Sequence, residues 1–118
     1  MFSLIEIFGI LIVHWVADFL LQNDMMANNK GRSNYWLGVH VSVNTSVWFV
    51  FIFVIFGLKD AALFALINFV CHFLIDYVTS RITGYFYMKK KWREFFNTIG
   101  IDQILHYVQI FLTYDYLR

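Results

Sequence analysis

Residues 14–22 read HWVADFLLQ, and this stretch determines how the rest of the chain is interpreted. A histidine, an aspartate and a glutamine (His14, Asp18 and Gln22) follow one another at intervals of four residues, and the residues between them are apolar. Four-residue spacing places side chains on one face of an α-helix. The stretch therefore predicts a helix in apolar surroundings that presents one polar row to a partner.

The composition of the whole chain indicates that these apolar surroundings are a membrane. The 118 residues are 60% hydrophobic and only 14% charged. A soluble domain of this size has a large surface to cover and needs more charged side chains for it. The formal net charge of +1 gives no reason to expect a nucleic-acid partner. The length predicts a single domain, residues 1–118.

Four apolar segments, at about residues 2–22, 35–57, 60–80 and 98–116, approach the length of a membrane-spanning helix. Such a helix needs about 20 residues. The segments show no alternation of polar and apolar residues, and lipid tolerates only helices or closed barrels. The sequence therefore predicts an all-α fold, namely a four-helix transmembrane bundle.

The basic residues of the short loops predict how this bundle is oriented. Loop one holds Lys30 and Arg32, whereas the opposite side holds only Lys59 and Arg118. Loop three holds the other five, which are Arg81, Lys89, Lys90, Lys91 and Arg93. Loops rich in lysine and arginine stay in the cytoplasm, so we expect loops one and three there and both termini on the non-cytoplasmic side. The basic and aromatic segment 85–97 is expected to lie at the interface, against anionic headgroups of membrane lipid.

Each of the four segments carries histidine or aspartate side chains near its cytoplasmic end, and all four histidines are among them. A charged side chain at a helix centre costs about 2.5–3.5 kcal/mol on insertion scales. A divalent cation would compensate this cost, because imidazole and carboxylate groups are common metal ligands. We expect one or two ions of Zn, Mn, Fe or Mg. The predicted ligands are His14, Asp18, His40, His72, Asp76, Asp102 and His106.

Neighbouring residues suggest further roles. Paired ions can clamp a phosphoryl group or activate a water, and Asp18, Asp76 or Asp102 could instead act as a general base. Lys30 and Arg81 flank the expected site and could hold an anionic substrate. Amide side chains are expected to orient the ligands through hydrogen bonds. These amides are Gln22, Asn44, Asn68 and Gln103.

The same motifs resemble a known family. HWVADFLLQ, Lys30, the histidine of GVH at 40, HFLIDY at 72–77 and DQILH at 102–106 occur in the order typical of the small integral membrane proteins grouped as domain of unknown function 3307, found in bacteria and their viruses. More distantly, the HxxxD pairs are similar to those of predicted membrane-bound metal-dependent hydrolases. The resemblance implies a protein of the bacterial inner membrane, and the distant likeness implies metal-dependent hydrolysis.

Three functions remain open. The first is a hydrolase acting on a phosphate-containing or lipid-linked substrate at the cytoplasmic interface. The second is a proton or metal-ion transporter or channel, although VWFVFIFVIF at 47–56 offers no polar path to the other leaflet. The third is a non-enzymatic, phage-type effector that binds a host membrane protein. The polar residues could also join helices by hydrogen bonds without any metal, and a homodimer is compatible with the small area that four short helices bury.

Overall fold

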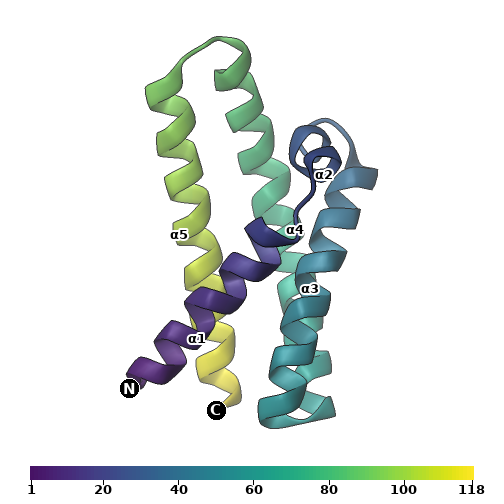
Figure 1. The fold of residues 1–118 in the computed structure, drawn as a ribbon, viewed down its shortest axis with the longest axis vertical. Coiled ribbons are helices and arrows are strands. Elements are labelled where there is room, and N and C mark those ends of the chain that lie inside the picture. The colour runs from purple at the N-terminus through teal and green to yellow at the C-terminus, as the bar shows by residue number, and fades with distance from the viewer.

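The computed structural model describes residues 1–118 and contains no strand, which confirms the predicted all-α class. Its elements are α1 (Leu4–Trp15), η1 (Val16–Leu20), α2 (Asp24–Asn29), α3 (Asn34–Phe56), α4 (Leu58–Met88) and α5 (Trp92–Leu117). Helix α4 packs against both α3 and α5, and α1 lies obliquely across the bundle (Figure 1). Both termini lie at one end, where Arg118 donates a hydrogen bond to the backbone carbonyl of Met1 (3.0 Å).

Local sequence signals explain where the helices begin and turn. Ser3 and Glu6 form a capping box at the start of α1. The side chains of Asn23 and Ser33 accept hydrogen bonds from the first turns of α2 and α3. Gly57 alone separates α3 from α4, with φ 94° and ψ −178°, a backbone conformation that essentially only glycine adopts. One glycine thus reverses the chain between two long helices.

The first apolar segment is not a uniform α-helix. At Val16 the α-helix gives way to the π-helical turn η1, in which Leu21 N donates to the carbonyl of Val16 (3.1 Å). The helix ends there, so Gln22 lies beyond it, although the predicted span reached residue 22. Loop one also contains the short helix α2. π-Helical turns occur frequently at functional sites, and this one carries Asp18.

Helices α4 and α5 extend further than the predicted spans 60–80 and 98–116. The expected interfacial segment 85–97 consists of the end of α4, a turn at 89–91 and the start of α5. Aromatic rings close this hairpin, with ring centroids 5.6 Å apart for Tyr87 and Trp92 and 5.8 Å apart for Tyr87 and Phe95. The 31 residues of α4 correspond to about 46 Å, which exceeds the roughly 30 Å of a bilayer's hydrocarbon core.

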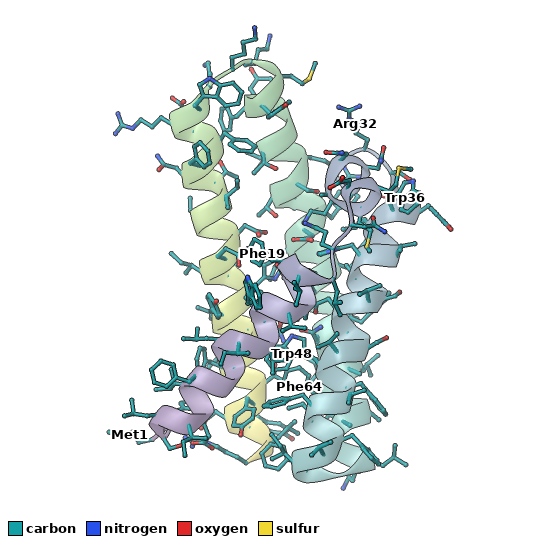
Figure 2. All side chains as sticks on the ribbon, viewed as in Figure 1. Met1, Phe19, Arg32, Trp36, Trp48 and Phe64 are labelled. Atoms are coloured by element: carbon teal, nitrogen blue, oxygen red, sulfur yellow. The ribbon has the colours of Figure 1, made fainter.

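The interior of the protein is as rich in polar side chains as in apolar ones. Eleven apolar and twelve polar or charged residues make up the 23 that are buried. Eight of the eleven apolar ones form a cluster around Trp48 and Phe64, toward the termini (Figure 2). Large apolar side chains face outward instead, among them Ile5, Val54 and Leu112. This distribution is the reverse of that in a soluble domain.

Helices α3 and α4 are long and apolar enough to cross a membrane. Only 28% of the most apolar window of each is buried inside the protein, whereas the core helix of a soluble protein would be mostly buried. Large exposed apolar surfaces mark contacts with a membrane or a partner. Length and composition of these two helices therefore support membrane association. Helices α1 and α5 do not meet the same criterion.

Candidate metal centre

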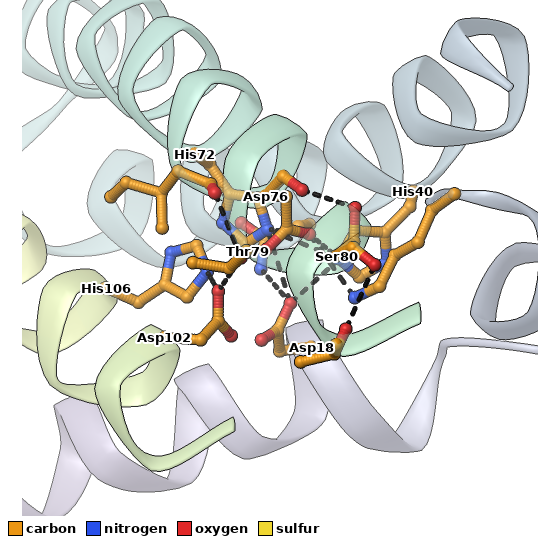
Figure 3. A network of polar contacts seen from close by, with 12 residues as sticks. Asp18, His40, His72, Asp76, Thr79, Ser80, Asp102 and His106 are labelled. Atoms are coloured by element: carbon orange, nitrogen blue, oxygen red, sulfur yellow. Dashed lines mark hydrogen bonds and ion pairs between the residues drawn. The ribbon is translucent and has the colours of Figure 1, made fainter. Parts of the chain in front are cut away.

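Six of the predicted metal ligands lie together in one buried cluster, to which all the long helical stretches contribute (Figure 3). None of the six is more than 9% exposed. Element η1 supplies one ligand, α3 supplies one, and α4 and α5 supply two each. In this order they are Asp18, His40, His72, Asp76, Asp102 and His106.

The carboxylate of Asp76 lies at the centre of the cluster. Its Oδ1 atom is 2.9 Å from Nε2 of His106. Its Oδ2 atom is 3.2 Å from Nε2 of His40 and 3.3 Å from Nε2 of His72. Imidazole rings from three helices therefore converge on a single carboxylate.

A second carboxylate, that of Asp18, contacts two of the same rings. Its Oδ1 atom is 3.0 Å from Nε2 of His40 and 3.4 Å from Nε2 of His72, and these two nitrogens are 3.3 Å apart. A neutral imidazole has one N–H, so these nitrogens make more close polar contacts than they have hydrogens to donate. A cation would satisfy such an arrangement of lone pairs.

Three overlapping groups of ligand atoms are close enough to hold a metal ion. In each group, one atom per residue lies within 4.8 Å of the others. The groups are Asp18 with His72 and His106, His40 with His72 and Asp76, and Asp76 with Asp102 and His106. Each of His72, Asp76 and His106 belongs to two groups, so the cluster resembles adjoining sites that share ligands.

The charges of the cluster do not balance within the chain when its histidines are neutral. Lys30 is the nearest cation, with Nζ 3.3 Å from Oδ2 of Asp76. Burial lowers the pKa of Lys30, but the carboxylates of Asp76, Asp18 and Asp102 outweigh burial and hold that pKa above its ordinary value. With neutral histidines, three carboxylates and one ammonium leave two negative charges. One divalent cation would neutralise them, and without a metal two histidines would have to be protonated.

The predicted amides contact carboxylates more than histidine rings. Asn44 Nδ2 donates to Oδ1 of Asp18 (3.4 Å), and Asn68 Nδ2 donates to Oδ1 of Asn44 (3.0 Å). Gln103 Nε2 donates to Oδ2 of Asp102 (3.0 Å). These amides therefore hold two of the carboxylates in place by hydrogen bonds from their N–H groups.

Two predicted residues, His14 and Gln22, lie at the margin of the cluster. His14 belongs to none of the three groups: its Nε2 lies 2.8 Å from Oε1 of Gln103 and 3.8 Å from Oδ2 of Asp18. Gln22 lines the adjoining cavity, and its buried Oε1 has no hydrogen-bond partner. The ring of His14 lies against α5, with its centroid 4.7 Å from that of Tyr107 and 6.0 Å from that of His106.

Arg81, predicted to hold the substrate beside Lys30, does not face the cluster. Its guanidinium lies 3.7 Å from the ring centroid of Tyr77 and donates to Oδ1 of Asn34 (2.8 Å). Arg81 follows Asp76 by five residues, which places it about 140° around the helix. It lines a second groove, which extends from the site between loop one and the end of α4.

Two residues of the site were not predicted. The hydroxyl of Thr79 donates to Oδ1 of Asp102. Thr79 follows His72 by seven residues on the same helical face, and this spacing could have identified it. Gly31 brings loop one against α4, because a Cβ atom at this position would lie 2.8 Å from the carbonyl oxygen of Ser80. This contact places the adjacent Lys30 near Asp76, and no local sequence pattern predicts it.

A cavity of about 230 Å³ adjoins the cluster. Its lining includes all three carboxylates of the cluster together with Lys30 and Thr79. A small polar group could therefore approach the ligands from the end of the molecule where α2 lies.

The chain belongs to the family of proteins of unknown function DUF3307, because the family's sequence profile matches residues 7–117. This match confirms the resemblance drawn from the motifs of the sequence. No curated protein and no solved structure matches the chain. The distant likeness to membrane-bound hydrolases stays a prediction. Family membership assigns no activity, so the function has to be argued from the site.

Proposed function

We propose that this protein is an integral membrane protein that binds one or two divalent metal ions and uses them to hydrolyse a phosphate-containing or lipid-linked substrate at the cytoplasmic interface. The observation that carries the proposal is the buried convergence of three carboxylates and three histidines, which with Lys30 carries two unbalanced negative charges when the histidines are neutral. Burying unpaired charge is very costly, and a divalent cation removes that cost with the ligand types it prefers.

The proposed setting is a bundle of four spans, formed by α1 with η1, α3, α4 and α5. The exposed apolar side chains and the polar interior support it. Seven of the nine lysines and arginines lie at the end that holds α2 and the α4–α5 turn, and Lys59 and Arg118 lie at the other. The bias of lysine and arginine toward the cytoplasm then puts the site on the cytoplasmic side of a bacterial inner membrane and the termini outside. Lys89, Lys90 and Lys91 would meet anionic headgroups.

The residues around the cavity suit hydrolysis of a phosphate ester. Bound divalent cations supply polarisation of a phosphoryl group and activation of water. Asp102 lines the cavity and is held by Thr79 and Gln103, so it is the candidate general base. Lys30 lies at the mouth of the cavity, where its ammonium group would contact the anionic part of the substrate.

The apolar cluster favours an enzyme over a transporter. Trp48, Ile52 and Phe64 are fully buried between the metal centre and the end that carries the termini. A conducting protein would need polar groups along that path, as ion pathways in membranes have. The effector alternative has different requirements. An effector would bind its host membrane protein through the lipid-facing surface and would not need the metal ligands.

Elemental analysis of the detergent-purified protein tests the metal proposal. We expect bound divalent metal in the wild type, loss of it in His72→Ala and Asp76→Ala, and retention in His14→Ala. The His14 variant is a matched control, because His14 and His72 are both fully buried but only His72 belongs to the ligand groups. A folded, metal-free wild type would overturn the proposal and favour a purely hydrogen-bonded cluster.

A separate assay tests the hydrolase. Phosphate release is measured with phosphorylated lipids and with nucleotides, in the presence of Zn, Mn, Fe or Mg. We expect release that depends on the metal and is lost in the metal-free His72→Ala variant. Absence of release with every metal and substrate would overturn hydrolysis, and the metal proposal would still be judged by elemental analysis.

A further inference from the structure

We propose that a groove beside the metal centre binds the headgroup of an anionic glycerophospholipid, so that the substrate is a membrane lipid and not a soluble phosphate. The inference deepens the proposed function and rests on it for the identity of the reacting site. The groove itself is an independent feature of the structure, and its ligand can be tested without any turnover.

The groove lies between loop one and the projecting part of α4. It has a volume of about 750 Å³, within the range of small-molecule sites. Lys30, Arg32 and Arg81 line it, and no acidic residue does. Its other lining residues include the aromatic and thioether side chains Tyr85, Tyr87, Met88 and Phe95. The groove is therefore both cationic and apolar, as an amphiphile carrying a phosphate requires.

No carboxylate neutralises either of the two arginines, so their charge is available to an anion. Arg32 is exposed beside α2 (Figure 2) and makes no ion pair or side-chain hydrogen bond. Arg81 contacts the ring of Tyr77 and the amide of Asn34, so no carboxylate neutralises it either. The planar guanidinium group binds phosphate oxygens in pairs. Charge complementarity thus points to a phosphate.

The depth of the groove points to a lipid as the source of that phosphate. Helix α3 has 23 residues and is about 34 Å long, close to the roughly 30 Å of a hydrocarbon core. Counted from Leu58, α4 reaches the same length near Ser80, which is where Gly31 touches it. The groove begins at Ser80 and continues away from the core. In the proposed orientation it therefore lies at the level of the lipid phosphates.

The groove is continuous with the cavity of the metal centre. Five residues line both of them, namely Ala27, Lys30, Ser80, Thr83 and Phe95. Lys30 in particular contacts Asp76 on one side and faces the groove on the other. A headgroup held by the arginines would thus lie next to the proposed reacting centre.

Binding of short-chain phosphatidic acid to the detergent-purified full chain tests this inference, with glycerol 3-phosphate as the soluble comparison. We expect the wild type to bind the lipid and the double variant R32Q/R81Q to bind it at least tenfold more weakly. The double variant K59Q/R118Q is the matched control, because it removes the same charge from exposed positions outside the groove, at the opposite end of the molecule. We expect its affinity to stay within twofold of the wild type.

Any other pattern of lipid binding overturns the inference. Equal binding of glycerol 3-phosphate would identify a soluble anion as the ligand, and equal losses in the two double variants would indicate only general charge attraction. Metal content measured on the same samples separates this inference from the proposed function. Lipid binding by a metal-free wild type would overturn the metal centre and support the groove. Bound metal without arginine-dependent lipid binding would overturn the groove alone.

Discussion

Asp76 is the residue on which the cluster depends most, because it contacts three histidines and Lys30. We predict that Asp76→Asn abolishes metal retention and lowers the free energy of unfolding by about 1–3 kcal/mol, since it leaves a largely buried ammonium without its partner. The double variant D76N/K30Q should recover part of that loss, because groups in direct contact couple. Unfolding in detergent micelles measures both effects. Strictly additive losses would show that Lys30 and Asp76 do not stabilise each other.

Gly31 is a second residue on which the site depends, because it positions loop one against α4. We predict that Gly31→Ala moves loop one away from α4, because the added Cβ meets the backbone carbonyl of Ser80 at 2.8 Å. Overpacking of this kind costs about 1–3 kcal/mol, and withdrawal of the Lys30 ammonium from Asp76 should strengthen metal retention, because it removes a positive charge that competes with the metal. Elemental analysis and unfolding measure the two consequences. Gly38→Ala is the control, since nothing lies within 4 Å of its added Cβ, and equal behaviour of the two variants would contradict the prediction.

The residues of the site could be predicted because ionisable side chains in apolar segments cost free energy to bury and therefore stand out in the sequence. Histidines and aspartates at four-residue spacing in apolar helices are costly to bury unless they bind one another or a common ligand. The structure brings His40, His72 and His106 together. His14 has the same spacing to Asp18 but lies outside the groups, because the crossing angle of α1 decides where its ring points and no local pattern encodes that angle. Arg81 could have been placed correctly from helical phase alone.

At the scale of elements, the junction between α3 and α4 is a single residue. We predict that Gly57→Ala lowers the free energy of unfolding by about 1–3 kcal/mol, because φ 94° with ψ −178° strains any side chain with a Cβ. Space is not the reason, since nothing lies within 4 Å of the added atom. Gly100→Ala in α5 is the control and should be neutral or stabilising by up to about 1 kcal/mol, because alanine favours helix. A similar effect of both substitutions on unfolding would contradict the role of Gly57.

The existence of the long helices was predictable, but their ends were less so. Hydropathy marks where a segment meets lipid, and a helix continues beyond that point unless a residue breaks it. No proline occurs in the chain, so α4 runs on to Met88 and α5 starts at Trp92. The π-helical turn at Val16–Leu20 has no sequence signature, since it depends on how η1 packs against α3.

For the whole molecule, the excess of apolar residues determines what the fold can be. A chain that is 60% hydrophobic but buries twelve polar residues among 23 must place apolar side chains on its surface. Lipid can cover such a surface at no cost, whereas water cannot. The all-α class followed from this argument, because every backbone polar group in lipid must be bonded within its own helix or barrel. How the helices pack did not follow, because packing depends on side-chain shape.

The last prediction concerns how this molecule lies in its membrane. In a Cys71→Ser background, we expect a membrane-impermeant maleimide to label Lys59→Cys in intact bacterial cells and Lys90→Cys only after the inner membrane is opened. Both lysines are exposed, and α4 alone separates them. In the proposed orientation, the excess of lysine and arginine around Lys90 keeps that end in the cytoplasm. The reverse labelling would contradict a cytoplasmic site, whereas labelling of both positions from one side would mean that α4 does not cross the membrane. In that case lipid could not be what covers the apolar surface, and the depth assigned to the groove would lose its physical basis.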